Sequence, residues 1–105
     1  MKTDKILSYL GLAAASRSAV CGTKAVLDEV RKRKQGICVL VAEDVSERSA
    51  KQLSDKCGYY NVPLIKIPCD MYLLGQRLGK KSPVAATAVT NPSLARQIIN
   101  CVRDA

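Results

Sequence analysis

Apolar residues recur along the chain at two spacings, and segments of the two kinds alternate. A repeat of three or four positions predicts helices over residues 3–16 and 23–34, from 44 or 46 to 57, and over 70–78 and 91–103. Short apolar runs predict strands over 19–21, 37–42, 62–67 and 84–89. The run 37–42 is continuously apolar, which is typical of a central strand covered on both faces.

Polar residues and glycines mark the ends of several predicted helices. Asp44 or Ser46 can cap the third helix, and Gly58 is expected to end it. Asn91, followed by proline at the first helical position, is a start signal for the last helix. Gly79 is expected to end the short helix that begins at Asp70. Alternating helices and strands with short connections predict one α/β/α sandwich domain over residues 1–105.

Charge and composition narrow the function classes. The chain has 17 Lys and Arg against 9 Asp and Glu, so its net charge of +8 favours acidic partners, nucleic acid before an anionic membrane. There is no histidine, which excludes Ser-His and Cys-His nucleophile pairs and histidine metal ligands.

The five cysteines point to a reducing compartment. Their odd number and irregular spacing fit neither a disulfide scaffold nor a zinc site, so we expect free thiols, no metal and a cytoplasmic protein. Residues 1–15 superficially resemble a secretory signal, but Asp4 lies in the would-be basic part and Ile6, Leu10 and Ala14 share one helical face. No apolar run approaches transmembrane length, so no membrane partner is expected.

Residues 75–82, GQRLGKKS, resemble a phosphate-binding loop without matching it. One residue is missing between the glycines, Lys81 stands where Ser or Thr would bind magnesium, and the segment ends a helix instead of starting one. We therefore expect no nucleotide cofactor. The basic run 31–34 invites a nucleic-acid interpretation, although cations are also favourable in the last turn of a helix.

The start of the second helix is the strongest candidate site. Gly22 permits close backbone approach, Thr23 can cap the helix, and free N–H groups there form an anion site to which Lys24 adds charge. A cation at the positive end of a helix is otherwise unfavourable. The alternative is an ordinary capped helix in which Lys24 pairs with Asp28.

These motifs, in order, resemble those of a known family. The segments LGLAAASRSAVCGTKAVLDEVRKRK, ICVLVAEDVSERSAKQLSDKCGYYNVPLIKI, LGQRLGK and VAATAVT are similar to the kink-turn RNA-binding ribosomal proteins of the L-seven-Ae and L-thirty-e type, in particular its bacterial YlxQ-like branch. The resemblance implies a three-layer α/β/α fold with a four-stranded mixed sheet. It also implies structured, kink-turn-like RNA as a partner, with the ribosome as a further candidate.

The same resemblance implies the site. The second helix would enter the groove of the kinked RNA, and the loop before the fourth helix would cover looped-out nucleotides. The implied RNA-binding residues are Gly22, Thr23, Lys24, Ala25, Asp28, Ile67, Pro68, Cys69, Asp70 and Met71. Apart from the resemblance, the basic side chains of Lys32, Lys34, Lys80 and Lys81 are candidates for phosphate contacts. Two departures stand out: Lys24-Ala25 replaces the Asn-Glu typical of archaeal and eukaryotic members, and 67–74 is one residue longer than usual.

The sequence therefore favours a non-enzymatic RNA-binding protein associated with translation or the ribosome. A protein-interaction module on the same fold is the first alternative. A small anion-binding enzyme is the weaker one, because the chain has no histidine and no paired catalytic groups.

Overall fold

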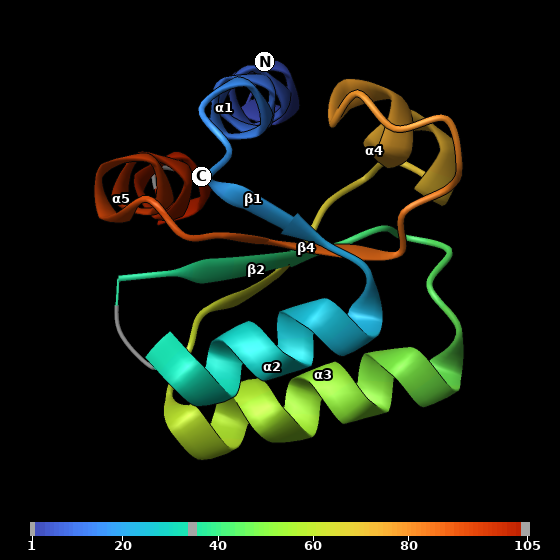
Figure 1. The fold of residues 1–105 in the computed structure, drawn as a ribbon, viewed down its shortest axis with the longest axis vertical. Helices are drawn as coiled ribbons and strands as arrows, with labels where there is room; N and C mark the ends of the chain where they lie inside the picture. The colour runs from blue at the N-terminus through green and yellow to red at the C-terminus, as the bar shows by residue number, and fades with distance from the viewer. Residues whose placement is uncertain (1, 34–35, 104–105) are drawn as a thin grey trace.

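The computed structural model describes residues 2–33 and 36–103, and in it every predicted helix and strand is present (Figure 1). The elements follow one another as α1 (Lys2–Ala15), β1 (Ala19–Cys21), α2 (Thr23–Arg33), β2 (Cys38–Val41), α3 (Glu47–Tyr60), β3 (Leu64–Lys66), α4 (Met71–Arg77), β4 (Ala86–Val89) and α5 (Pro92–Arg103).

The four strands form one mixed sheet in the order β1-β4-β2-β3. Strand β4 runs antiparallel to both of its neighbours, whereas β2 and β3 are parallel. Helices α2 and α3 cover one face of the sheet, and α1, α4 and α5 cover the other (Figure 1). The expected three-layer α/β/α fold with a four-stranded mixed sheet is confirmed.

Strand β2 divides its side chains between two hydrophobic cores. Cys38 and Leu40 belong to the core beneath α1, α4 and α5, and Val39 and Val41 belong to the core beneath α2 and α3. All four are buried, because the strand lies inside the sheet and has a helical layer on each side. The continuously apolar sequence of this strand is the consequence of that position.

Helix α3 does not end at Gly58, as the sequence predicted. It continues to Tyr60, and the left-handed residue is Asn61, with φ 57° and ψ 41°. The N–H of Val62 then donates to the carbonyl of Cys57 at 2.8 Å, which closes the helix end. Tyr60 and Val62 both pack on the core beneath α2 and α3. This packing favours continuing the helix past Gly58, whose backbone can adopt the helical conformation.

The N-caps predicted for α3, α4 and α5 are confirmed, and the choice between Asp44 and Ser46 is settled. The Ser46 hydroxyl accepts from the N–H of Ser49 at 3.2 Å and caps α3, whereas Asp44 is engaged elsewhere. The Asp70 carboxylate accepts from the N–H of Leu73 at 2.8 Å and caps α4. The side-chain oxygen of Asn91 accepts two N–H groups at the start of α5.

Candidate functional site

Helix α2 begins at Gly22, whose backbone conformation explains why glycine occupies the position. Its φ of +98° lies in a region that residues with a side chain rarely adopt. The N–H of Gly22 donates to the carbonyl of Ala86 at 3.0 Å, and its own carbonyl accepts from the N–H of Val26 at 2.9 Å. Gly22 is therefore the N-cap, and Thr23, expected to be able to cap, is instead the first helical residue.

The first turn of α2 leaves its donors available. In the described ranges, no acceptor lies within hydrogen-bond distance of the N–H groups of Thr23, Lys24 or Ala25. Such orphan N–H groups, together with the helix dipole, give this end a partial positive charge. The Lys24 side chain is exposed beside them.

Lys24 does not pair with Asp28. A carboxylate oxygen of Asp28 lies 3.8 Å from a guanidinium nitrogen of Arg31. Within the part of the chain that the structure describes, no carboxylate lies within 4.0 Å of the Lys24 ammonium group. The alternative in which Lys24 pairs with Asp28 is therefore wrong. The ammonium group of Lys24 lies at a positive helix end without a carboxylate partner among the described residues.

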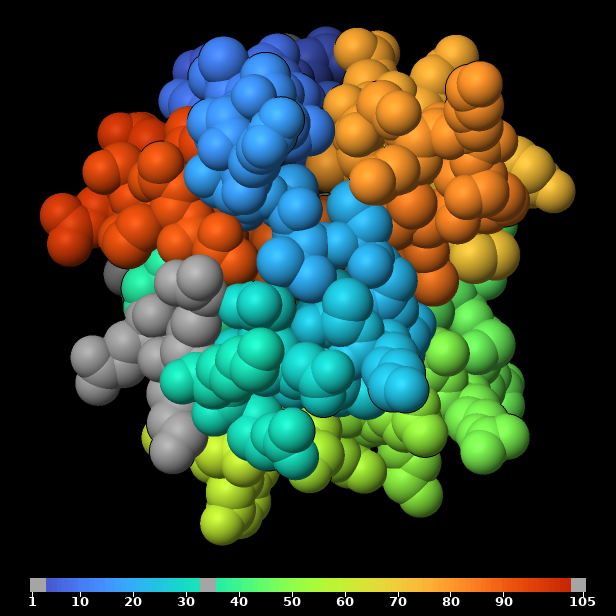
Figure 2. Space-filling model, in the orientation of Figure 1, coloured from blue at the N-terminus to red at the C-terminus, as the bar shows by residue number. Residues whose placement is uncertain are grey.

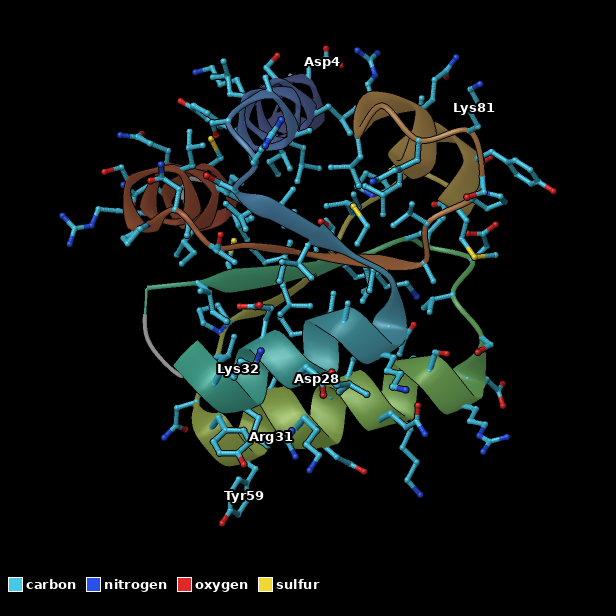
Figure 3. The ribbon with its side chains drawn as sticks, in the orientation of Figure 1. Asp4, Asp28, Arg31, Lys32, Tyr59 and Lys81 are labelled. Atoms are coloured by element: carbon cyan, nitrogen blue, oxygen red, sulfur yellow. The ribbon has the colours of Figure 1, made fainter. Side chains whose placement is uncertain are left out.

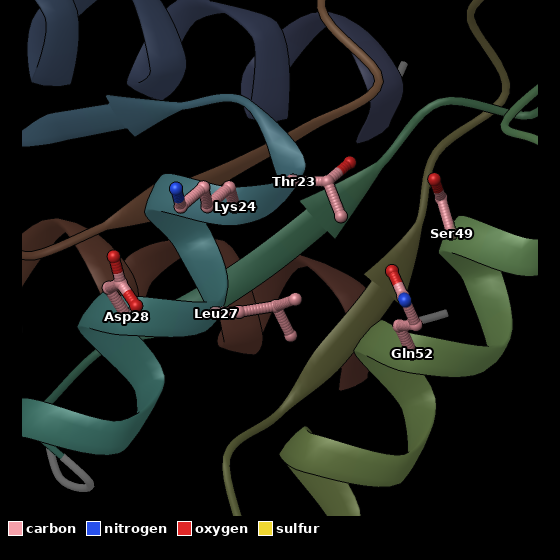
Figure 4. A pocket seen from close by; sticks show the side chains of 6 residues that line it. All are labelled: Thr23, Lys24, Leu27, Asp28, Ser49 and Gln52. Atoms are coloured by element: carbon pink, nitrogen blue, oxygen red, sulfur yellow. The ribbon is translucent and has the colours of Figure 1, made fainter.

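An open groove of about 380 Å³ lies beside this helix start, between α2 and α3 (Figure 4). Its lining combines hydroxyl, amide, charged and apolar groups: Thr23, Lys24, Leu27 and Asp28 from α2, and Ser49 and Gln52 from α3. The groove thus offers hydrogen-bond donors and acceptors around one apolar side chain.

Hydrogen bonds join the two segments that the sequence assigned to one site. Four loop segments, around residues 22, 42–44, 67–71 and 84–86, are linked along one edge of the sheet. The links run from Gly22 to Ala86, Ala42 to Ala85, Glu43 to Cys69, and from both Asp44 and Val84 to Met71. Figure 2 shows the surface of the β1–α2 junction, in blue to cyan, beside the orange surface that follows α4. The start of α2 and the loop before α4 therefore lie on the same edge.

The five residues of the second segment, 67–71 before α4, differ in burial and therefore in role. Ile67 and Cys69 are buried, and burial raises the pKa of the Cys69 thiol, so both side chains serve the core. Pro68 and Asp70 are exposed and Met71 is half-buried, so these three side chains can meet a ligand.

The start of α4 differs from the start of α2 because two of its N–H donors are bonded to carboxylates. The N–H of Met71 donates to a carboxylate oxygen of Asp44 at 2.9 Å, and the N–H of Leu73 donates to Asp70. Two carboxylates thus lie at this helix end and more than offset its partial positive charge. Compared with the start of α4, the start of α2 has no carboxylate bonded to its N–H groups in the described ranges, and it carries a cation.

The structure describes three of the four basic residues expected to contact phosphates, and these three do not lie together. Lys32 is exposed near the other end of α2, roughly 12 Å along the helix from Lys24 (Figure 3). Lys80 and Lys81 are exposed in the turn after α4. Lys34 lies outside the described residues.

All five cysteines are free in the structure. Burial raises the pKa of the Cys38 thiol to about 12 and that of Cys57 to about 11. Within residues 2–33 and 36–103, no cluster of His, Cys, Asp and Glu could hold a metal ion. None of the helices there has the length and apolar character needed to cross a membrane.

Comparisons with known proteins agree with this architecture. A family model described as the ribosomal protein L7Ae/L30e/S12e/Gadd45 family matches residues 4–99. The RNA-binding protein YlxQ of Bacillus subtilis (strain 168) is 38% identical over 91 residues, covering 87% of this chain and 88% of that protein. RNA-binding protein YlxQ of Enterococcus faecium is 31% identical over 81 residues, covering 77% of each.

Two solved structures have similar folds. A protein of unknown function from Bacillus halodurans superposes with a TM-score of 0.85 at 28% identity, covering 94% of this chain and 97% of that one. The Giardia lamblia 15.5kD RNA binding protein superposes with a TM-score of 0.81 at 18% identity, covering 98% of this chain and 86% of that one. At that identity, the second likeness concerns the fold alone.

Proposed function

Because this chain belongs to the ribosomal protein L7Ae/L30e/S12e/Gadd45 family, we propose that it is a non-enzymatic RNA-binding protein that recognises a kink-turn or a similarly kinked internal loop. The relatives named RNA-binding protein YlxQ support RNA as the partner. A net charge of +8 favours the same class of ligand.

The observation that carries the proposal is the open N-terminus of α2. Its unsatisfied N–H groups, the unpaired Lys24 ammonium group and the positive helix end all favour an anion. The N–H groups are fixed by the helix, so they suit phosphates and base edges held in one particular arrangement. Such a site favours RNA of a given shape over any polyanion.

The second segment supports the same interpretation. Pro68 and Met71 present apolar surface on the same edge, where unstacked bases of an internal loop can pack. The Asp70 carboxylate caps α4 by accepting from the N–H of Leu73, so the positive helix end offsets part of its negative charge. Lys32, Lys80 and Lys81 lie off this edge and would hold the flanking backbone.

We further propose that the protein acts in the cytoplasm in association with translation or the ribosome. Five free thiols favour a reducing compartment. The family description, which names ribosomal proteins, supports the association.

The test compares a kink-turn RNA with a perfect duplex of the same length. At about 0.15 M salt, where the screening length is about 8 Å, diffuse attraction is reduced. A shape-selective protein should prefer the kink-turn at least about tenfold, or about 1.4 kcal/mol, and should bend it in a fluorescence-transfer assay.

Two single substitutions make the test specific. Lys24→Ala should reduce the preference, because it removes charge from the shape-selective site. Lys32→Ala, at the other end of the same helix, should weaken the binding of both RNAs about equally. If the two RNAs bind alike and Lys24→Ala affects them alike, the kink-turn proposal is wrong and a protein-interaction module on this fold replaces it.

A further inference from the structure

An open groove of about 390 Å³ lies on the outer face of α4, and neither the start of α2 nor residues 67–71 line it. Its lining residues are Tyr72, Leu73, Gln76, Lys80, Lys81 and Ser82. We propose that this groove binds unpaired nucleotides of a single-stranded RNA segment, with a base stacked on Tyr72 and its phosphates held by Lys80 and Lys81. The proposal rests on the proposed function only in taking RNA as the ligand.

Tyr72 is exposed in a way that the fold does not explain. Its side chain is 72% exposed, while Leu74 on the same short helix is fully buried and Met71 and Leu73 pack against the core. Tyr72 and Gln76 are four positions apart, so they share one face of α4. An aromatic ring with an amide one turn away can stack on a base and hydrogen-bond its edge.

The turn that carries the two lysines is held firmly against α4. The N–H of Lys80 donates to the carbonyl of Gly75 at 2.8 Å, and Gly79 between the helix and this turn has a φ of +75°. A Cβ on Gly75 would collide with the carbonyl oxygen of Ser82, so the turn approaches the helix as closely as glycine permits. The N–H of Val84 then bonds the carbonyl of Met71 at 3.0 Å. The lysine backbone is thus fixed before any ligand arrives.

The charge of the groove favours an anionic ligand. No carboxylate belongs to its lining, and none lies within 4.0 Å of Lys80 or Lys81 in the described ranges. The acids at the start of α4, Asp44 and Asp70, already accept backbone N–H groups. Two cations beside an exposed aromatic ring match the combination of phosphate contacts and base stacking by which proteins bind single-stranded RNA.

The groove also lies next to the edge that carries the start of α2 and residues 67–71, so an RNA strand bound at that edge could continue into it. Tyr72 directly follows Met71, the last residue of that edge, and the turn after α4 leads back to it through Val84. Figure 3 shows Lys81 beside α4, on the opposite side of the sheet from Lys32 and Asp28 on α2. A bound strand leaving the kink would therefore pass onto α4 and not along α2.

The experiment uses a single-stranded RNA hexanucleotide with 2-aminopurine at its centre, whose fluorescence is quenched when the base stacks. Tyr72→Ala should weaken hexanucleotide binding about tenfold and remove the quenching, whereas Tyr72→Phe should retain both. Substituting Lys80→Ala and Lys81→Ala together should weaken binding and flatten its salt dependence. The matched control is Tyr59→Ala on α3, since Tyr59 is 78% exposed and should not matter.

Lys24→Ala distinguishes this site from the proposed kink-turn site. It should weaken the binding of kink-turn RNA and leave the binding of the hexanucleotide unchanged. The groove proposal is overturned if Tyr72→Ala binds the hexanucleotide like the parent, or if Tyr59→Ala loses as much affinity. It is also overturned if only the lysine substitutions matter, because the groove would then be a general anion contact. A protein that binds the hexanucleotide through Tyr72 but shows no kink-turn preference would support the groove and reject the kink-turn.

Discussion

The carboxylate of Asp44 accepts a hydrogen bond of 2.9 Å from the backbone N–H of Met71, 27 positions later in the chain. Asp44 follows β2 and Met71 begins α4, so this bond ties the end of one strand to the helix that follows its parallel neighbour. A second bond in parallel, from the N–H of Glu43 to the carbonyl of Cys69 at 2.9 Å, reinforces the link. The loop before α4 is thereby held on the same edge as the start of α2.

Asp44→Ala should lower the free energy of unfolding by about 0.5–2 kcal/mol, the usual effect of removing a helix cap. The neighbouring Glu43→Ala is the control, because the bond of Glu43 is made by its backbone and survives the substitution. It should stay within about 0.5 kcal/mol of the parent in urea unfolding. Equal losses for the two variants would mean that Asp44 does not act as a cap.

Lys24→Ala should leave the stability unchanged or raise it slightly, by no more than about 0.5 kcal/mol. The substitution removes a cation from a positive helix end, where it has no carboxylate partner among the described residues. Thermal unfolding at low salt measures the effect. A clearly destabilised variant with normal RNA affinity would make Lys24 a structural residue.

Gly75→Ala should destabilise the protein by more than about 1 kcal/mol, because the added Cβ collides with the backbone carbonyl of Ser82, which cannot move like a side chain. Gly58→Ala is the matched comparison within a helix, since nothing lies within 4 Å of a Cβ built there. That variant should gain about 0.4–1 kcal/mol from reduced freedom of the unfolded chain. Similar effects at both glycines would contradict the close approach of the turn to α4.

Val39→Ala should lower the free energy of unfolding by about 1–3 kcal/mol, through lost burial and the cavity left between β2 and the α2–α3 layer. RNA binding at low temperature should remain nearly intact, because Val39 is fully buried and lies away from the edge. Parallel urea-unfolding and binding measurements check both statements. Loss of binding without loss of stability would contradict the assignment of Val39 to the core.

The stability should fall as the pH rises above 9. Burial raises the pKa of the Cys38 thiol from 9.0 to about 12, so between these values the unfolded chain loses a proton that the folded chain keeps. The contribution of the protonated Cys38 thiol to the free energy of unfolding is complete below pH 9 and is lost as the pH approaches 12. In Cys38→Ala, the free energy of unfolding should decline less steeply across this window. Identical slopes would mean that the thiol titrates normally in the folded protein.

The local patterns of the sequence were sufficient for the elements and their layers. Alternating helical and strand spacings, and the continuously apolar β2, required an α/β/α sandwich because each segment can bury only the face that its period defines. The caps at Ser46, Asp70 and Asn91 were also predictable, since a cap bonds N–H groups two or three residues away. Gly58 was misleading because the helix end was decided by the packing of Tyr60 and Val62.

In the candidate site, too, local features could be predicted from the sequence and contacts between side chains could not. Gly22, Thr23 and Lys24 could be singled out from the sequence because a glycine before a helix and a lysine in its first turn are local features. The sequence alone could not show whether Lys24 is neutralised, because Asp28 has three basic neighbours within reach on the helix, Lys24, Arg31 and Lys32. In the structure Asp28 pairs with Arg31.

Residues far apart in the chain needed the tertiary structure. The sequence by itself determined which residues form helices and strands, and which helix start is positive, since these depend on neighbours within one turn. Only the tertiary structure decided that Asp44 bonds the first N–H of α4, that Ile67 and Cys69 turn inward, and that Tyr72 shares a groove with Lys80 and Lys81. Those relationships follow from the sheet order β1-β4-β2-β3, which brings the four loops to one edge through backbone hydrogen bonds that carry no sequence signal.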